Sequence, residues 1–386
     1  IVRIGIQFEL DIDSTDIHDI YAAFSRSLRP AIEGLISEAV SPSGEAAMRD
    51  GTIAKKLGGP VSWKTTTGTS TTELYTPWGW VRVPLLQVTT KDDKRRHYIT
   101  RMLLGIERWT RIPDATRRTF AGMATHATYR ACQAIGSMLG GVKHALGTIH
   151  RAALKVGASI LPSIDHDERA VYEADGTGIP ITGGGKGYEI KVLSQRTRDG
   201  KIRIAGMVMG KVQRGWGSLI RMIQKDRRQA VLIQDGDRGI RHAIAYRGKG
   251  ISVQICLWHI AHALKHTLWA DGEKGKSRMK GYVFGRLHKI LRERHDQMPE
   301  TVEHRLKCLA GYCRRRGLAN TATYLDMAAP LSQTYRYKGA GSPTTSRTER
   351  VMRTLNKRIN VGTWSIKGAE AICRLRGAWY YNGWRP

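Results

Sequence analysis

Three acidic residues stand in stretches whose pattern could bring their carboxylates together. Asp175 lies inside a strand-like run, Asp235 ends the apolar run VLIQ, and Glu349 lies in a basic helical stretch. Converging carboxylates repel one another and raise each other's pKa unless divalent cations hold them. Hard oxygen ligands suit Mg²⁺ or Mn²⁺, and two such ions could stabilise the attacking and leaving oxygens of a displacement at phosphorus. The trio therefore indicates metal-dependent phosphoryl transfer.

Each acid has a simpler alternative. Asp-Gly after a strand is a common turn signal, so Asp235 could be only a turn residue. Glu349 could be an ion-pair partner on a basic surface, and Glu370 on the next helix is a rival third acid. For Asp237 we favour a helix-capping role over a ligand role, because Asp caps helix N-termini well.

The elements that would position these acids read as a mixed α/β domain over residues 161–386. Three consecutive strands (ERAVYEADGTGIPIT, KGYEIKVLSQ, KIRIAGMVMG) are followed by helix, strand, helix and strand up to ISVQICLW. This is the order of an RNase H-like mixed sheet with helices on both faces, in which the first and fourth strands are neighbours. The pattern places Asp175 and Asp235 side by side. A helical insertion is expected at about 260–343, and a last helix at roughly 344–360.

The preceding residues suggest a DNA-binding region. Residues 1–60 give only a strand-like VRIGIQFEL and a helix around 16–38, and 61–90 predict a small β-hairpin. Within 61–160, a helix is expected to open at Asp114 as its N-cap, and the short helices of 128–157 match a helix-turn-helix outline, although a plain packing hairpin has the same shape. The residues expected to contact DNA here are Arg117, Arg118, Lys143, His144, Thr148 and Arg151, joined by Arg353 and Arg358 beside Glu349.

Composition points to a polyanion as partner. The 386 residues contain 63 Lys and Arg against 33 Asp and Glu, a formal charge of +30. Such an excess opposes compaction unless a polyanion neutralises it, and nucleic acid is the expected one. A membrane is not, since no run approaches the ~20 apolar residues of a transmembrane helix. Five scattered cysteines without a Cys-x-x-Cys pair favour a reducing cytoplasm, here in association with the nucleoid.

Four motifs together carry a family resemblance. EADGTGIPI, QDGDRGIRHAI, CLWHIAHALK and SRTERVMRTLNKRINVGTWSIKGAEAICRLR follow one another in this order. In them the chain resembles a DDE transposase of the Mutator-like superclass, in the branch of bacterial insertion-sequence enzymes. The resemblance covers roughly residues 60–384. It implies that Asp175, Asp235 and Glu349 are the catalytic metal ligands, holding two Mg²⁺ or Mn²⁺ ions.

The third motif adds a Cys-x-x-His element, Cys256 and His259. A lone pair of this kind is a poor zinc site, and the resemblance implies that His259 is an active-site residue; a structural histidine is the alternative. Trp258 and Trp364 could stack on an unpaired base or pack in the core. His262 and His266 follow on the same helix and could contact the DNA backbone.

The implied activity is transposition. The enzyme would bind the terminal repeats of its mobile element, cut the DNA with activated water and join the freed 3′-hydroxyl to target DNA. A homodimer on double-stranded DNA is expected, because two ends must be paired. Two alternatives remain: an RNase H-like nuclease without strand transfer, and a decayed or domesticated copy that only binds DNA.

Overall fold

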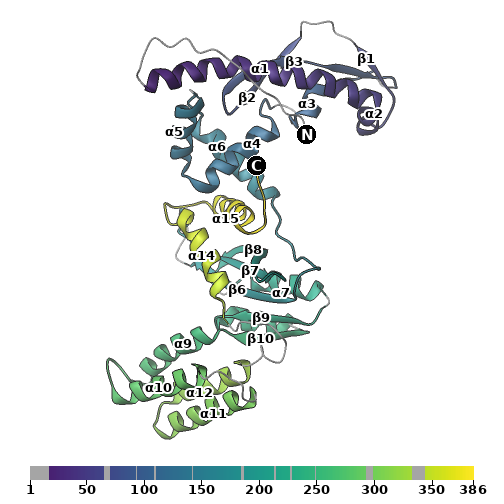
Figure 1. Ribbon diagram of the computed structural model, residues 1–386. Helices are drawn as coiled ribbons and strands as arrows, with labels where there is room; N and C mark the ends of the chain where they lie inside the picture. Colours follow the sequence, from purple (N-terminus) through teal and green to yellow (C-terminus); the bar gives the residue numbers. More distant parts are fainter. Residues whose placement is uncertain are drawn as a thin grey trace. The chain divides into compact units, whose positions relative to one another are not determined.

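The computed structural model describes residues 17–64, 70–92, 94–107, 110–140, 142–183, 187–212, 214–226, 228–247, 249–292, 299–332 and 344–386. The chain divides into two compact units (Figure 1). One contains the residues up to Ser159 with Arg385 and Pro386, and the other is Ile160–Trp384. The strand expected from VRIGIQFEL lies outside the described residues. In those that are described, no helix is both long and apolar enough to cross a membrane.

The first unit begins with two helices and two small sheets. Helix α1 (Ile17–Arg49) extends well beyond the expected helix and is followed by α2 (Thr52–Leu57). A hairpin of β2 (Thr71–Thr76) and β3 (Gly79–Pro84) forms one sheet. The other sheet has the order β1 (Val61–Lys64), β4 (Gln87–Thr90) and β5 (Arg96–Tyr98). The expectation of one small hairpin was therefore too simple, because strands of three or four residues give almost no sequence pattern.

Four helices complete this unit: α3 (Ile99–Leu103), α4 (Asp114–His126), α5 (Tyr129–Gly140) and α6 (Leu146–Ser159). α4 packs against both α5 and α6. The helices expected in 114–157 are thus present. One detail of the expectation was wrong: Pro113 is the N-cap of α4, and Asp114 lies in its first turn, where its carboxylate pairs with Arg117.

The second unit is built on a five-stranded mixed sheet. Its strands are β6 (Val171–Gly178), β7 (Tyr188–Arg196), β8 (Ile202–Lys211), β9 (Ala230–Gln234) and β10 (Ile251–Ile255). The spatial order is β8-β7-β6-β9-β10. The pairs β6–β7 and β7–β8 are antiparallel, whereas β6–β9 and β9–β10 are parallel. All five strands expected from the sequence are therefore present, and β6 and β9 are neighbours.

Helices cover both faces of this sheet (Figure 1). On one face, α7 (Trp216–Lys225) and α8 (Arg238–Arg247) bury Tyr172 and Ala174 of β6. On the other, α14 (Ser346–Ile359) packs against β6 and α15 (Ile366–Tyr381) against β8. Because side chains alternate along a strand, the odd-numbered residues of β6 turn towards α14. Glu173 does so, and Asp175 lies two residues further on.

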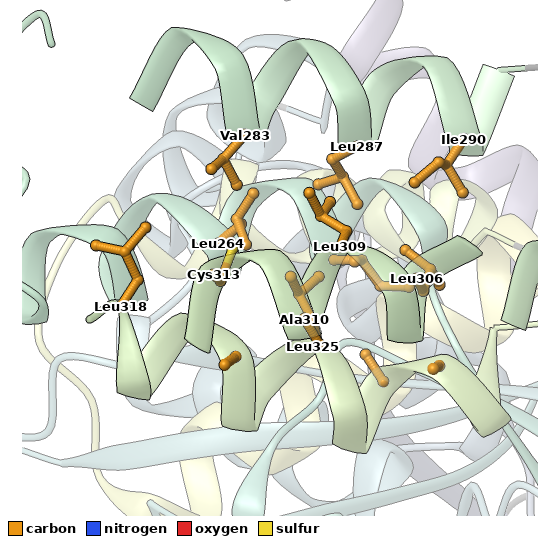
Figure 2. Close-up of a cluster of buried hydrophobic side chains, with 14 of the residues drawn as sticks. Leu264, Val283, Leu287, Ile290, Leu306, Leu309, Ala310, Cys313, Leu318 and Leu325 are labelled. Atoms are coloured by element: carbon orange, nitrogen blue, oxygen red, sulfur yellow. The ribbon is translucent and has the colours of Figure 1, made fainter. Parts of the chain in front are cut away.

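A helical subdomain follows β10. It contains α9 (Leu257–Ala270), α10 (Arg278–Arg292), α11 (Pro299–Arg315), α12 (Ala319–Ala328) and the short 3₁₀ helix η1 (Ala329–Leu331). Figure 2 shows side chains of these helices meeting in one apolar interior, among them Leu264, Val283, Leu309 and Leu325. The expected helical insertion is thus present as far as the structure describes it; its expected end, 333–343, lies outside the described residues.

Candidate active site

The parallel pairings of β6 with β9 and of β9 with β10 end in the same row of the sheet. In the sheet, Ala174 lies opposite Gln234, and Gln234 lies opposite Ile255. The residue that follows this row is Asp175 in β6, Asp235 after β9 and Cys256 after β10. The sequence order of the strands reverses between β6 and β9, since β7 and β8 follow on one side of β6 and β9 and β10 lie on the other. Open α/β sheets bind ligands beyond the carboxyl ends of strands at such a point. The fold thus brings two of the three predicted acids together, although sixty residues of sequence separate them.

The turn after β9 is shaped to hold Asp235. The backbone N–H of Asp237 donates to Asp235 Oδ1 at 2.9 Å, and that of Gly236 donates to Gln234 Oε1 at 2.5 Å. Gly236 has a φ of 102°, which favours glycine. Asp237 Oδ1 accepts from the N–H of Ile240 at 3.0 Å at the start of α8. The expectation that Asp237 caps this helix is confirmed, whereas Asp235 is the residue directly after β9.

The electrostatics of the two aspartates are coupled. Burial raises the pKa of Asp175 to about 7, and the negative charge of Asp235 pushes it in the same direction. The N–H of Gly176, which donates to Asp175 Oδ1 at 2.7 Å, and the nearby His259 partly oppose this rise in pKa. Burial also raises the pKa of Asp235. The site therefore holds two carboxylates short of compensating positive charge, an arrangement that favours binding of a cation.

Glu349 lies within electrostatic range of this pair. It stands in the first turn of α14, and its charge contributes to the raised pKa of Asp175. Its Oε1 accepts a hydrogen bond from Thr345 Oγ1 at 3.4 Å. The rival Glu370 is instead in an ion pair with Arg374 one turn along α15. Of the two candidate third acids, Glu349 is the one coupled to Asp175.

An anchor that the sequence did not reveal fixes the start of α14. Glu173 is fully buried on β6, and its Oε2 accepts from the N–H of Thr348 at 3.1 Å and from Thr348 Oγ1 at 2.9 Å. Its Oε1 accepts from Arg196 Nε at 2.7 Å, and Arg196 in turn donates to the carbonyl of Thr344 at 3.0 Å. The acid two residues before Asp175 therefore ties the helix of Glu349 to the strand of Asp175. A Glu in an apolar strand was its only signal in the sequence.

Cys256 and His259 form a second polar pair at the same edge. The N–H of Cys256 donates to the carbonyl of Gln234 at 2.8 Å, and its Sγ accepts from the N–H of Thr345 at 3.5 Å. Burial opposes ionisation, but hydrogen bonds from His259 and Thr345 outweigh it, and the pKa of Cys256 falls. For His259, burial is outweighed by Cys256, Asp235 and Asp175, and its pKa rises. His259 therefore favours its protonated, cationic form beside the acidic pair.

The donor set fits a divalent cation in part. Asp175 and Asp235 supply hard oxygens beside one another, and burial raises the pKa of each. Among the residues that the structure describes, however, no three His, Cys, Asp or Glu side chains converge closely enough to enclose a metal ion. Glu349 is directed to Thr345 by its hydrogen bond. A complete ligand set would require Glu349 to release Thr345 and turn to the aspartates.

The residues expected to contact DNA separate into two groups. Arg118, Lys143, Arg151 and Arg353 are exposed, and Thr148 is half-buried. Arg117 is only 6% exposed; it pairs with Asp114 at 2.6 Å and Glu107 at 3.7 Å and donates to Thr110 Oγ1. Its position in the interior corrects the expectation that it faces DNA, since its donors are already used by protein groups.

His144 and Arg358 need the same correction. His144 is 1% exposed and lies between Tyr75 Oη at 2.7 Å and the carbonyl of Pro77 at 2.9 Å, and burial lowers its pKa. The guanidinium of Arg358 is buried over the ring of Trp364, 4.7 Å from its centroid. Both side chains are structural, because their polar ends are turned into the protein.

The two tryptophans whose roles the sequence left open are now distinguished. Trp364 is 8% exposed, and its Nε1 donates to the carbonyl of Ile359 at 2.8 Å, so it packs in the core. Trp258 is 58% exposed in the first turn of α9, beside His259.

Comparison with protein-family models gives no match for this chain, and a search of curated proteins gives none either.

Proposed function

We propose that this chain is a DNA transposase that cuts and joins DNA at a site formed by Asp175, Asp235 and Glu349. The observation that carries the proposal is the register that sets Asp175 and Asp235 side by side, one residue past the last parallel pair of β6 and β9, with the pKa of both raised. Two like charges buried side by side destabilise the folded protein, and binding of a cation or a proton relieves this repulsion. Such pairs are therefore typical of functional sites.

The fold we propose for the second unit is RNase H-like. The order β8-β7-β6-β9-β10, with three antiparallel strands followed by two parallel ones and helices on both faces, supports it. In such a sheet the first and fourth strands carry the two aspartates, and a helix beside the first strand carries the third acid. α14 packs against β6 and carries Glu349, in agreement with this arrangement.

Each residue has a defined part in the proposed chemistry. Asp175 and Asp235 would hold Mg²⁺ or Mn²⁺, completed by Glu349 once it leaves Thr345. The ions, when bound, supply charge stabilisation for the attacking and leaving oxygens and favour deprotonation of water. His259, kept cationic by the acids and Cys256, would neutralise charge on the scissile phosphate. Binding of DNA would favour the movement of Glu349 to the metal ions, because the DNA phosphates need bound metal ions to offset the negative charge of the carboxylates.

Two successive displacements would use this one site. In the first, water attacks phosphorus, the bond to the 3′ oxygen breaks, and that oxygen takes up a proton. In the second, the freed 3′-hydroxyl attacks a phosphorus of target DNA, and the broken bond leaves a new 3′-hydroxyl on the target strand. Each step breaks one P–O bond and forms another, so no oxidant or nucleotide is consumed.

The first unit would bind the ends of the mobile element. Exposed Lys143 and Arg151 on and before α6, with Arg118 on α4, support a phosphate-contacting surface. The charge of +30 supports strong binding to double-stranded DNA. We propose a homodimer on DNA in the cytoplasm, because two ends must be cut together.

Incubation with the DNA that flanks the gene, in Mg²⁺, Mn²⁺ or EDTA, tests the proposal. Sequencing gels should show metal-dependent cuts at the element ends, and a labelled end with a free 3′-hydroxyl should become joined to plasmid DNA. Cutting without joining would indicate a nuclease, and binding without either reaction would indicate a DNA-binding protein.

A further inference from the structure

Helix α9 presents an exposed row of rings. Trp258 is 58% and Trp269 60% exposed, and His262 and His266 between them are exposed as well. The rings of Trp258 and His262 stack, with centroids 5.2 Å apart and planes 11° apart, and His266 meets His262 edge-on at 5.3 Å. Large exposed rings in register along one helix face are characteristic of a binding surface. We call Trp258, His262, Lys265, His266 and Trp269 the α9 ridge.

The opposite face of α9 keeps the ridge in place. Ile260, Leu264 and Leu268 are fully buried in the interior of the helical subdomain, where Figure 2 shows Leu264 among the side chains of the neighbouring helices. These residues repeat every four positions, so α9 has one buried and one exposed face. The ridge therefore stands on a fixed helix and is already ordered before a ligand binds.

The charge of the ridge suits a polyanion. α9 contains Lys265 and three histidines but no Asp or Glu from Leu257 to Ala270. Asp271, the carboxylate just after the helix, accepts from the N–H groups of Asn320 and Thr321 and so is engaged at the start of α12. Rings interleaved with cations bind single-stranded nucleic acid, because bases stack on the rings while phosphates contact the cations.

The ridge leads away from the candidate active site. Trp258 contacts the ring of His259 at 4.8 Å, and His259 is electrostatically coupled to both Asp235 and Asp175. From Trp258 to Trp269 the helix rises about 16 Å, enough for roughly five nucleotides at the spacing of a stacked strand. A strand leaving the acidic pair would meet the ridge directly.

We propose that the α9 ridge binds single-stranded DNA next to the scissile phosphate, as a track for the strand that is separated from its complement during cutting. The inference rests on the proposed function, which supplies a reason for unpaired DNA at this place. Trp258 and Trp269 stack on bases, and Lys265 with His262 and His266 contacts the intervening phosphates. The recognition is independent of sequence, since every base has a ring face.

Binding without catalysis tests this directly. The full-length protein is titrated into a fluorescent oligothymidylate and into a duplex of the same length, in EDTA. Replacing Trp258→Ala and Trp269→Ala together should weaken single-strand binding by about ten-fold to a hundred-fold, and duplex binding by less than about two-fold. The Trp258→Phe, Trp269→Phe pair should restore most of the affinity, since Phe retains a stacking ring.

Tyr246→Ala is the matched control, because Tyr246 is an exposed ring on α8 that contacts His242 four residues earlier, outside the ridge. It should leave single-strand binding unchanged. Equal loss for single strand and duplex in the alanine pair, or no loss at all, would overturn the proposal. Since the assay needs no cleavage, its failure would leave the proposed reaction standing, and a chain that binds oligothymidylate through the ridge but never cuts DNA would refute only the proposed function.

Discussion

Asp175 lowers the stability of the folded protein at neutral pH, because its carboxylate is largely buried at the candidate site. Its folded pKa of about 7 lies above the ordinary value of 3.8, so folding favours its protonated form. Its contribution to stability is therefore fully present below about pH 4 and is lost as the pH rises through 7. A carboxylate kept under such unfavourable conditions is typical of functional sites, where binding of a ligand restores the balance.

The change Asp175→Asn should expose this imbalance. Asn keeps the hydrogen bond from Gly176 but carries no charge. In urea denaturation with EDTA, we expect the variant to be more stable than the parent by roughly 2–4 kcal/mol at pH 8 and nearly equal to it at pH 4. Mg²⁺ should raise the denaturation midpoint of the parent only. A variant that is less stable at pH 8 would contradict the assigned environment of Asp175.

Residue type alone gave wrong predictions of DNA contacts for side chains whose role depends on their partners in the folded protein. Arg117, His144 and Arg358 have the side chains of DNA-binding residues, and all three are buried against protein groups. The pairing of Arg117 with Asp114 follows from their i,i+3 spacing on α4, but nothing in the sequence indicates the second pairing, with Glu107. The capping role of Asp237 was predictable from sequence, because the turn chemistry of Asp-Gly-Asp before a helix is local.

At the scale of elements, β6 and α14 act as one part. The buried Glu173 on β6 accepts two hydrogen bonds from Thr348 on α14, and this contact sets the position of Glu349 one residue later. The strands of this sheet and the helices between them were predictable, because apolar strand runs alternate with helical stretches and are separated by Gly and Asp turn signals. The contact between them was not, since it joins residues 175 positions apart.

Thr348→Val should separate positioning from folding. It removes the hydroxyl that donates to Glu173, and loss of one buried hydrogen bond to a charged group should lower the free energy of unfolding by about 1.5–3 kcal/mol. DNA affinity should persist while the cleavage rate falls at least ten-fold, as Glu349 is no longer fixed. Thr354→Val, further along α14, should alter the rate little. Equal rates for the two variants would contradict the anchoring role.

The molecule combines a strongly basic chain with the largely buried acidic pair Asp175 and Asp235. A charge of +30 suits the DNA backbone, whereas Asp175 and Asp235 would repel it unless cations are bound. The first unit was the harder half to predict: its short strands β1, β4 and β5 form a sheet that no sequence period revealed. The helices α4, α5 and α6 were predicted, whereas α1 runs well past its expected end and α2 and α3 were not expected.

DNA binding by the first unit should follow its exposed cations. Lys143→Ala and Arg151→Ala should each lower the slope of log affinity against log salt by about one unit and weaken binding to the element ends. Lys201→Ala removes the same charge from an exposed position between β7 and β8 and serves as the control. Affinities measured by fluorescence anisotropy across a salt series decide the matter: slopes that stay at the parent value would place the DNA-binding surface elsewhere.

The most direct test of the account compares Asp235→Asn with Asp237→Asn in cleavage of end-containing DNA with Mg²⁺. The two residues share one turn, but Asp235 lies beside Asp175 and Asp237 caps α8. Asn preserves size in both, caps a helix nearly as well as Asp, and lacks the charge that a hard cation needs. We expect the single-turnover cleavage rate to fall by several orders of magnitude for Asp235→Asn and by less than about three-fold for Asp237→Asn, with DNA affinity unchanged in both. If both variants cleave like the parent, Asp235 is only a turn residue and the proposed catalytic site is wrong.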